Sequence, residues 1–377
     1  MQFQSDMLGS EVLVSDSEEM SAIGAACAAG IVLGILPADV TEQIKRTAYH
    51  PQMDEELRIK KWNGWKRAVV SICNSMIQEE MTMEKLQISK NGRYFTYPDG
   101  TPFVWLADTA WTMPQRMKWD DVTYFMEERK RQGFTVLQIV ALDPERDIEM
   151  RNPTGEKALL DDDLLTPNER YFSYLDWILD KAAEYGFYVL LLPVWGQLVV
   201  GHDWGGKTYE KTVTEANAYQ YGKWIGERYK NKNHILWCLG GDRQPIHLGV
   251  DYRPVWRKMA EGLAKGITGK DLHYNRKDPA WEKLMITYHA CHERETGECS
   301  TMSYWTDEEA WIRLSCCSPD MDWNRELRTC EKRYDRQQVM PVWDGEPAYE
   351  MMPTSWPPVN ASFHGSWMVR KRAYWSL

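Results

Sequence analysis

The chain of 377 residues lacks several features that would place a protein in a class at once. Residues 22–36 are apolar, but about 15 positions rich in glycine and alanine are too few for a membrane-spanning helix. The first residues show no basic start followed by an apolar stretch, so no signal peptide is predicted. We therefore expect a cytoplasmic protein that has no membrane partner.

Positive charge is in short supply, because the formal net charge is −10. Phosphate backbones need a basic surface, so nucleic acid is not expected as a partner. An acidic polysaccharide remains open, since a pocket can be locally basic in an acidic protein. No GxGxxG or GxxxxGK[ST] loop follows the first predicted strand, which argues against a nucleotide site. We expect no cofactor.

Metal and disulfide signatures are also missing, although eight cysteines are present. None of them forms a CxxC pair, and their spacing matches no disulfide framework, so reduced thiols are predicted. Cys291, His292 and Cys299 could be imagined as metal ligands, but their spacing fits no zinc pattern. The acidic residues 161–163 are interpreted as a solvated loop and not as a calcium site. No metal is expected.

Phenylalanine is rare, with 8 residues against 19 tryptophans and 19 tyrosines. Tryptophan and tyrosine carry a polar group on a flat apolar ring, which suits contact with both the C–H bonds and the hydroxyls of a sugar. Core packing explains most of these side chains individually. The excess of tryptophan is therefore only a weak indication of carbohydrate binding.

From residue 84 onward, short apolar runs alternate with stretches of helical periodicity. This alternation predicts an α/β fold with a parallel sheet, and the missing phosphate loop favours a (β/α)8 TIM-type barrel over a Rossmann fold. Strands are predicted near 103–107, 134–141, 187–194, 234–239, 284–288, 311–315 and 338–343. Helices are predicted near 119–132, 168–185, 215–230, 252–265 and 322–336, with one more after 362.

Only seven strands are found, so we expect a barrel that lacks its last strand. The preceding residues 1–80 have another texture, with many small residues and two predicted helices, near 17–30 and 53–75. We expect them to form a short helical extension and residues 84–377 to form the barrel domain.

Two strand ends carry carboxylates. Residues 234–243 (HILWCLGGDR) read as a buried strand, a glycine pair and then Asp242 beside Arg243. Residues 338–347 (QVMPVWDGEP) have the same form and lead to Glu346. In parallel barrels chemistry lies at the C-terminal ends of strands, and glycosidases need a pair of carboxyl groups. Asp242 could equally cap the next turn and pair with Arg243, which would oppose a role as general acid.

Other strand ends supply the rest of a candidate pocket. His289 could orient Glu346 or bind a hydroxyl, but a buried, hydrogen-bonded histidine is equally consistent with its position. Asp108 could bind sugar hydroxyls or cap a helix, and the tryptophans could be sugar platforms or packing. The proposed substrate-binding residues are Asp108, Trp111, Gln138, Trp195, Arg243, His289, Trp343 and Tyr349.

Residues 10–75 resemble the C-terminal part of carbohydrate kinases related to glycerol kinase and xylulokinase. The resemblance lies in residues 17–30 (SEEMSAIGAACAAG) and 61–69 (KWNGWKRAV). In that family the nucleotide and sugar sites are completed by upstream parts that this chain lacks, so no kinase activity is expected. The resemblance implies a remnant joined to a second protein, whose natural start would be Met81 or Met83.

Residues 84–377 resemble the apiosidase-like glycoside hydrolases, a barrel family that acts on plant cell-wall polysaccharides. Six motifs occur in order: WLADTAW (105–111), GFTVLQ (133–138), LPVWG (192–196), LGGDR (239–243), ITYH (286–289) and DGEP (344–347). The resemblance implies that Asp242 is the acid/base and Glu346 the nucleophile or its partner carboxylate. The family continues into an eighth strand after a segment that matches 373–376.

The leading hypothesis is a glycoside hydrolase that releases a terminal sugar, with apiose as a candidate, from pectic side chains. Another glycoside, such as an arabinoside, would need the same chemistry. A carbohydrate-binding barrel without turnover and a sugar kinase are the competing classes. The sequence names neither the sugar nor the stereochemical outcome, and it makes no prediction of oligomeric state.

Overall fold

A computed structural model describes residues 1–16, 20–37, 39–59, 61, 83–143, 151–202, 207–208, 210–289, 300–317, 338–347, 349–354 and 361–375. The chain separates into two compact units, residues 1–80 and 81–377. Each unit is considered by itself below. Within the described residues no helix is both long and apolar enough to cross a membrane.

The first unit is built on a two-stranded antiparallel sheet. It consists of α1 (Gln2–Leu8), β1 (Val12–Ser15), α2 (Met20–Val32), a 3-10 turn η1 (Val40–Gln43) and β2 (Arg46–Tyr49). Val12 pairs with Tyr49 and Ser15 with Arg46. The carboxylate of Asp6 accepts the backbone N–H groups of Gln52 and Met53, which fixes the chain after β2 against α1.

The expected helical extension contains α1 and α2, but it also contains a strand pair, β1 and β2, that was not predicted. Each strand has only four residues, and the signal of alternating polarity is weak at that length. Helix α2 confirms the first predicted helix and begins at Met20. Most of the second predicted helix, near 53–75, lies outside the described residues.

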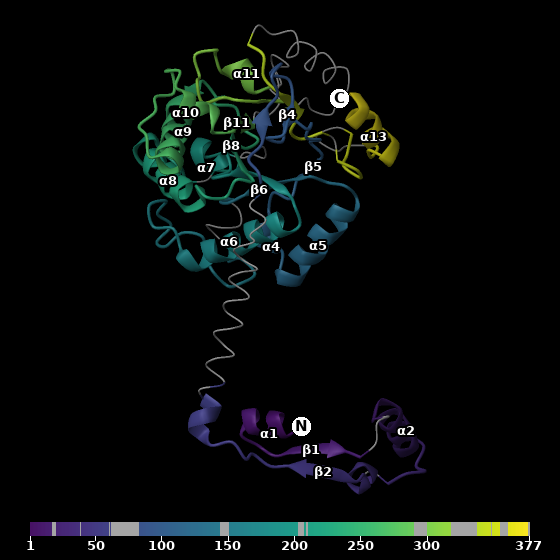
Figure 1. Ribbon diagram of the computed structural model, residues 1–377. Helices are drawn as coiled ribbons and strands as arrows, with labels where there is room; N and C mark the ends of the chain where they lie inside the picture. Colours follow the sequence, from purple (N-terminus) through teal and green to yellow (C-terminus); the bar gives the residue numbers. More distant parts are fainter. Residues whose placement is uncertain are drawn as a thin grey trace. The chain divides into compact units, whose positions relative to one another are not determined.

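The second unit alternates strands and helices along its length (Figure 1). The main strands are β5 (Ala107–Asp108), β6 (Val136–Val140), β7 (Tyr188–Leu192), β8 (Ile235–Gly240), β11 (Ile286–His289), β12 (Ser315–Cys317) and β13 (Val342–Asp344). The long helices are α5 (Trp119–Arg131), α6 (Glu169–Glu184), α8 (Glu215–Tyr229), α9 (Arg253–Thr268) and α13 (Ser366–Trp375).

Short elements fill the connections. They are β3 (Gln87–Ile88), β4 (Phe95–Thr96), α4 (Met113–Arg116), α7 (Gln197–Val200), β9 (Ile246–His247), β10 (Val250–Asp251), α10 (Pro279–Glu282) and α11 (Thr301–Tyr304). Strands β3 and β4 form a hairpin, and Gly92 in its turn has a positive φ of 76°, as Asn-Gly turns require.

The strands lie in the order in which they occur in the chain. Strands β5, β6, β7, β8 and β11 form one parallel sheet, and β12 pairs in parallel with β13. A parallel bridge between Ile286 and Ile312, with the N–H of Arg313 bonded to the Ile286 carbonyl, joins the two sheets. Among the described residues no backbone pairing links β13 to β5, and the rings of Trp105, just before β5, and Trp343 of β13 lie in contact with their centroids 5.5 Å apart.

These strands and helices confirm the predicted α/β barrel architecture, with differences at the ends of elements. The first strand begins at Ala107 and the sixth at Ser315, each about four residues later than predicted. The predicted strand near 311–315 overlaps the bridge at Ile312. The position of the strand was therefore predicted correctly, but its boundaries were not. The predicted helix at 322–336 lies outside the described residues.

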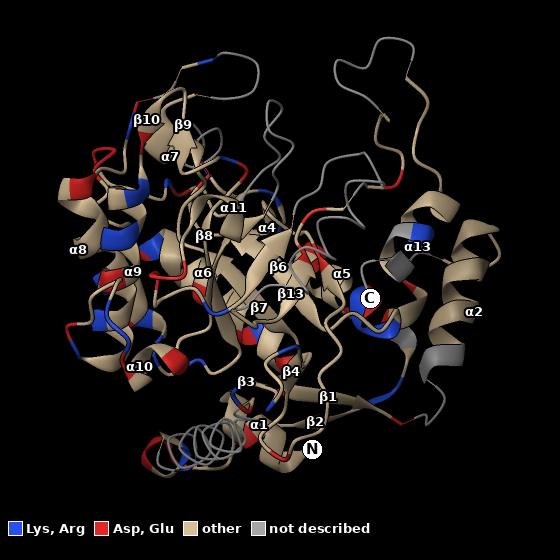
Figure 2. Cartoon of the chain, turned by 90° about the horizontal axis from the view of Figure 1, so that it is seen from above, with Lys and Arg blue, Asp and Glu red and all other residues tan. Residues whose placement is uncertain are grey.

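Two apolar layers flank the strands. Along β6, Val136 and Val140 face the inner cluster with Leu190 and Cys238, whereas Leu137 and Ile139 face the helices. This alternation follows the two-residue period of a strand. Every residue of β6, β7 and β8 is buried, as expected for a parallel sheet covered on both faces. Both basic and acidic residues occur along α8 and α9 (Figure 2).

Candidate active site

The end of β8 makes an unusually tight turn that presents Asp242. Gly240, Gly241 and Asp242 all have positive φ angles, of 84°, 105° and 52°. A Cβ on Gly240 would lie 2.6 Å from the His289 carbonyl oxygen, and one on Gly241 would lie 2.7 Å from the Trp195 ring. Only glycine tolerates both this backbone region and this closeness. The glycine pair therefore determines where the Asp242 carboxylate emerges.

Arg243 lies directly beneath that carboxylate. Its side chain is only 1% exposed, and its Nη1 lies 3.2 Å from the Asp242 Oδ2. The Nε–H donates to the His202 carbonyl at 3.0 Å, and the Tyr288 hydroxyl donates to the Arg243 carbonyl at 2.8 Å. The guanidinium is thus fixed in place, and its positive charge favours the ionised form of the neighbouring acid.

Glu346 follows β13 on the other side of the unit's interior. Gly345 packs so closely that a Cβ there would lie 2.4 Å from the Cys316 sulfur. The Gln138 amide of β6 donates to the Gly345 carbonyl at 2.9 Å. The Tyr349 hydroxyl donates to the Glu346 Oε1 at 2.5 Å. Glu346 is therefore positioned by β6, by the floor beneath Gly345 and by its own following loop.

His289, at the end of β11, contacts both acidic segments. Its Nδ1 accepts the backbone N–H of Asp242 at 3.2 Å, and its Nε2 lies 3.6 Å from the Glu346 Oε2. Burial lowers the pKa of His289 to about 4, although the charge of Asp242 acts in the opposite direction. The ring is therefore neutral at pH 7. Since Nδ1 accepts a hydrogen bond, the proton must reside on Nε2, facing Glu346.

Burial also acts on Glu346. It raises the pKa of the Glu346 carboxyl, while hydrogen bonds from Tyr349 and Trp111 act in the lowering direction. The same environment raises the pKa of the Tyr349 hydroxyl, which therefore remains a donor. The side chains of Asp242 and Glu346 nevertheless keep 29% and 24% exposure, so a ligand can reach both carboxylates.

Aromatic rings surround His289. The ring centroids of Trp111 and Trp195 are 5.4 Å apart, and they lie 5.4 and 6.1 Å from the His289 ring. The Trp111 indole N–H donates to the Tyr349 hydroxyl at 3.3 Å. Both tryptophans are half-buried, so each combines packing with an accessible edge. The structure thus brings Trp111, Gln138, Trp195, Arg243, His289 and Tyr349 together around Asp242 and Glu346.

Two predicted substrate-binding residues lie elsewhere. Asp108 forms an ion pair with Arg129 of α5, because its neighbour in register, Leu137, belongs to the layer that faces the helices. Trp343 is 6% exposed and packs in the inner cluster, with its ring 5.5 Å from Trp105. The positions of Asp108 and Trp343 therefore do not favour direct contact with a sugar.

Residues 161–163 are exposed, and no group of three or more potential metal ligands occurs in the described part of the chain. Cys291, His292 and Cys299 lie outside it. Cys27 and Cys238 are buried free thiols.

Thr301 was missed by sequence reasoning. Its hydroxyl donates to the Tyr288 carbonyl at 2.6 Å and accepts the Cys316 N–H at 2.8 Å. It therefore links the strand that carries His289 to the strand beneath Gly345. No local pattern marks this threonine, because it lies in a connecting segment and its partners are 13 and 15 residues away.

Comparison with known proteins agrees with this architecture. Two solved structures match with a TM-score of 0.62 and 26% identity over 79% of this chain: a family 5 glycoside hydrolase from Bacteroides vulgatus and a second protein described as a glycoside hydrolase. The chain spans 60% and 64% of those two proteins. The chain thus shares its barrel fold with these glycoside hydrolases.

A second comparison identifies the family to which this chain belongs. The model described as "Apiosidase-like, catalytic domain" matches residues 89–377, more than half of the chain. The chain therefore belongs to the apiosidase-like family.

A separate similarity covers a short part of the chain. Glycerol kinases from Staphylococcus epidermidis and Thermotoga maritima are 42% and 43% identical over 72 residues. These matches cover 18% of this chain and only 14% and 15% of the kinases. The similarity is thus confined to a small part of each kinase.

Proposed function

We propose that the barrel hydrolyses a glycosidic bond and releases a terminal sugar from a plant cell-wall polysaccharide, with apiose on pectic side chains as the first candidate. The observation that carries this proposal is the position of His289, which contacts the Asp242 segment through Nδ1 and the Glu346 carboxylate through Nε2. Two accessible carboxyl groups around one buried imidazole, with tryptophans beside them, suit cleavage between two sugars.

In the proposed mechanism Glu346 is the nucleophile and Asp242 the acid/base. The Tyr349 hydroxyl donates a hydrogen bond to Glu346, which favours its ionised form, and the Nε2 of His289 lies 3.6 Å from the same carboxylate. Asp242 would protonate the leaving oxygen and then activate water. Arg243 opposes the protonated form of Asp242, so the assignment requires that bound substrate desolvates this carboxyl.

Asp242→Asn and Glu346→Gln test the pair. Each substitution keeps the size of the side chain and removes its acid–base function, so we expect hydrolysis to fall roughly 1000-fold or more while sugar binding is retained. Matched controls are Asp161→Asn and Glu282→Gln, two exposed positions that should keep full activity. Unchanged hydrolysis in both site variants would refute the assignment. Binding without turnover in the wild-type chain would instead favour a non-catalytic carbohydrate-binding barrel.

The pH profile of hydrolysis distinguishes the two roles. If Glu346 must be ionised, its raised pKa places the acidic limb of the profile above the ordinary carboxyl range. Tyr349→Phe removes a hydrogen bond that lowers this pKa, so the acidic limb should move further up. Movement of the basic limb instead would make Glu346 the acid and Asp242 the nucleophile.

We also propose that residues 1–80 are a kinase-derived segment without kinase activity, in a protein that resides in the cytoplasm. The similarity to glycerol kinases covers only 14% of the relative from Staphylococcus epidermidis, which supports this reading. Incubation of the full chain with ATP and glycerol should give no glycerol phosphate. Measurable phosphoryl transfer would refute the proposal and leave the assignment of the barrel untouched.

A further inference from the structure

A small basic pocket lies at the end of the barrel opposite the candidate active site. The loops that lead into β8 and β11 supply Lys230, Lys232, Asn233 and Lys283, and Lys85 comes from the segment before β3. Ile235 and Trp237 of β8 and Met285 before β11 form its apolar floor. The carboxylates of the active site follow the C-terminal ends of strands, so the two sites are separated by the length of the strands.

The lysines of the pocket outnumber their acidic partners among the described residues. Lys232 pairs with Asp180, but Lys85, Lys230 and Lys283 have no ion pair within the part of the chain that the structure describes. Burial lowers the pKa of Lys85, and the charge of Lys283 lowers it further, which shows that the two ammonium groups lie close enough to repel each other. The whole chain has a net charge of −10, so this local excess of positive charge is unusual for it and favours binding of an anion.

The dimensions of the pocket restrict that partner. Its cavity of about 20 Å³ has room for one or two water-sized groups. Lys230, Asn233 and Lys283 are exposed at its edge, whereas Lys85 and Lys232 are partly buried. So small a space, lined by lysines and an asparagine, admits one or two oxygen atoms of an anion, while the rest of the anion, like a sugar ring or a nucleoside, would remain at its edge.

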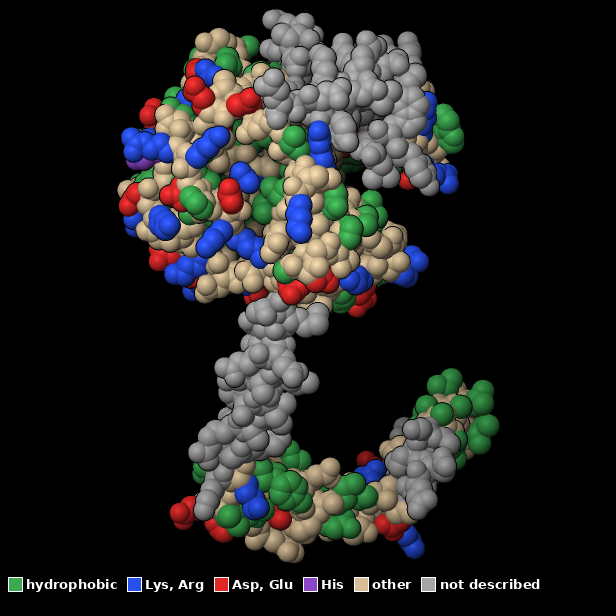
Figure 3. Space-filling view, turned by 45° about the horizontal axis from the view of Figure 1, so that its top comes forward, with side chains coloured by type: hydrophobic (Ala, Val, Ile, Leu, Met, Phe, Trp, Pro, Cys, Tyr) green, Lys and Arg blue, Asp and Glu red, His purple; other side chains and the backbone are tan. Residues whose placement is uncertain are grey.

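We propose that this pocket binds a small oxyanion, which is either inorganic phosphate or the carboxylate of a uronic acid unit. The anion neutralises Lys85 and Lys283 and accepts hydrogen bonds from the surrounding ammonium groups and from Asn233. Lys and Arg side chains are also interspersed with acidic ones over the surface of the barrel unit (Figure 3), but such mixed surfaces give no single convergent site. The inference is independent of the proposed hydrolysis.

Titration calorimetry on the full chain tests the proposal, with inorganic phosphate as the first ligand at constant ionic strength. We expect saturable binding that weakens at least tenfold in the Lys85→Gln, Lys283→Gln double variant. Lys118→Gln, which removes an exposed charge before α5, is the matched control and should bind as the wild-type chain does. Equal binding by the double variant, or no saturable binding of either ligand class, would overturn the proposal.

A second arm separates the two sources of the anion. A galacturonic acid disaccharide and a neutral galactose disaccharide are titrated under the same conditions. Binding of the acidic sugar with loss in the double variant assigns the pocket to a uronate, and binding of phosphate alone assigns it to an inorganic ion. Binding of the neutral sugar with the same affinity as the acidic one would contradict recognition of charge.

Thermal unfolding without ligand excludes a purely structural role for these lysines. If the pocket is an anion site, the double variant should unfold at the same temperature as the wild-type chain or higher, because a repulsion has been removed. Phosphate should then raise the unfolding temperature of the wild-type chain and of Lys118→Gln, but not that of the double variant. A variant that is destabilised without ligand and still stabilised by phosphate would contradict the proposal.

Discussion

The two units of the chain bury their apolar residues to very different degrees. Every residue of β6, β7 and β8 in the barrel is buried. In the first unit Val32, Leu33 and Ile35 are 85%, 70% and 73% exposed. Burial of one such side chain is worth about 1.5–3 kcal/mol, so the first unit forgoes most of the stabilisation that its sequence could provide.

The described part of the first unit leaves several large apolar side chains exposed, on its helices as well as on its strands. The barrel, by contrast, encloses two apolar layers within one unit. The predictions below test whether stability and function are in fact concentrated in the barrel.

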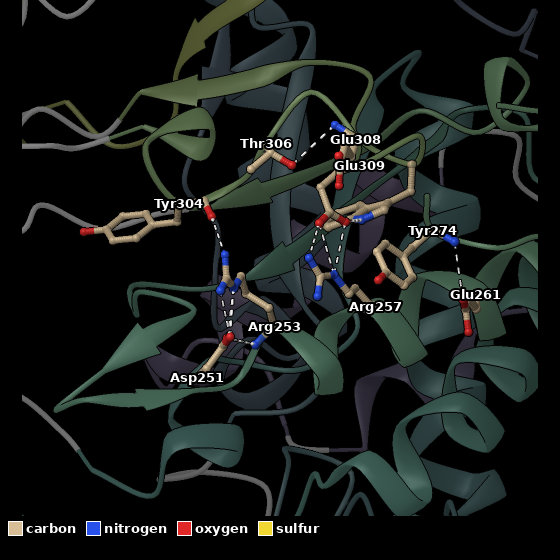
Figure 4. Close-up of polar contacts among 10 residues, drawn as sticks. Asp251, Arg253, Arg257, Glu261, Tyr274, Tyr304, Thr306, Glu308 and Glu309 are labelled. Atoms are coloured by element: carbon tan, nitrogen blue, oxygen red, sulfur yellow. Dashed lines mark hydrogen bonds and ion pairs between the residues drawn. The ribbon is translucent and has the colours of Figure 1, made fainter. Parts of the chain in front are cut away.

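The largest effect is expected from Glu309, a buried carboxylate of the barrel. It accepts hydrogen bonds from Arg257 of α9 and, at 2.7 Å, from the Trp311 indole (Figure 4). Glu309→Ala leaves Arg257 without its partner. We therefore expect the free energy of unfolding, measured in urea, to fall by about 3–5 kcal/mol. The neighbouring Glu308 is exposed, and Glu308→Ala should change stability by less than about 0.5 kcal/mol. Equal effects of the two substitutions would contradict this account.

A second effect concerns pH. His234 is buried with its Nε2 3.0 Å from the Leu179 carbonyl, and burial lowers its pKa to about 4. In the unfolded chain the imidazole is protonated below about pH 6.5, whereas in the folded chain it stays neutral down to about pH 4. The contribution of His234 to the free energy of unfolding is therefore fully present above pH 6.5 and is lost as the pH falls towards 4.

The loss attributable to His234 is about 3 kcal/mol. His234→Gln should reduce the dependence of unfolding free energy on pH between 7 and 4, and the part that the buried His289 contributes should remain. The exposed His273 provides the control, and His273→Gln should leave the slope as it is. An unchanged slope for His234→Gln would show that His234 does not contribute to the pH dependence of stability.

A smaller change in stability, with a large change in activity, is expected at Gly240. Gly240→Ala places a Cβ 2.6 Å from the His289 carbonyl in a region of positive φ, which should cost about 1–3 kcal/mol. The backbone movement that relieves this contact should displace Asp242. The rate of hydrolysis should therefore fall by more than the loss of folded protein explains. Gly249 has a similar φ of 77° but open space around it, so Gly249→Ala should leave activity intact. Full activity of Gly240→Ala would contradict the role of the turn.

The smallest effect is expected in the first unit. Leu33 is exposed, so Leu33→Ala should change the unfolding of the full chain by less than about 0.5 kcal/mol. The same substitution at the buried Leu191 of β7 should cost about 2–5 kcal/mol. Comparable losses at both positions, measured by denaturant unfolding, would show that the contrast between the units does not hold.

Strand and helix order could be predicted because apolar periodicity is a local property. The ends of β8 and β13 were also recognisable, since a glycine next to a carboxylate is a local pattern. The direction of Asp108 was not, because it depends on whether β5 starts at an odd or an even position. Predicting its ion pair with Arg129 would have required that register.

Other features of the site come from contacts between distant residues. The amide of Gln138 reaches the carbonyl of Gly345 across 207 positions, and Trp111 reaches Tyr349 across 238. Periodicity carries no information on such pairs. The strands β1 and β2 were missed for another reason, since four residues are too few to distinguish alternation from chance.

The seam between β13 and β5 has an evolutionary consequence. In the described residues the segment of Glu346 is held by backbone pairing with β12 on one side only and by the Gln138 amide of β6, whereas Asp242 follows a strand that is paired on both sides. A single substitution at the seam could therefore shift one carboxylate without disturbing the other. Because carboxyl separation decides whether a glycosidase retains or inverts configuration, this seam is where related sequences could drift from one stereochemical outcome to the other.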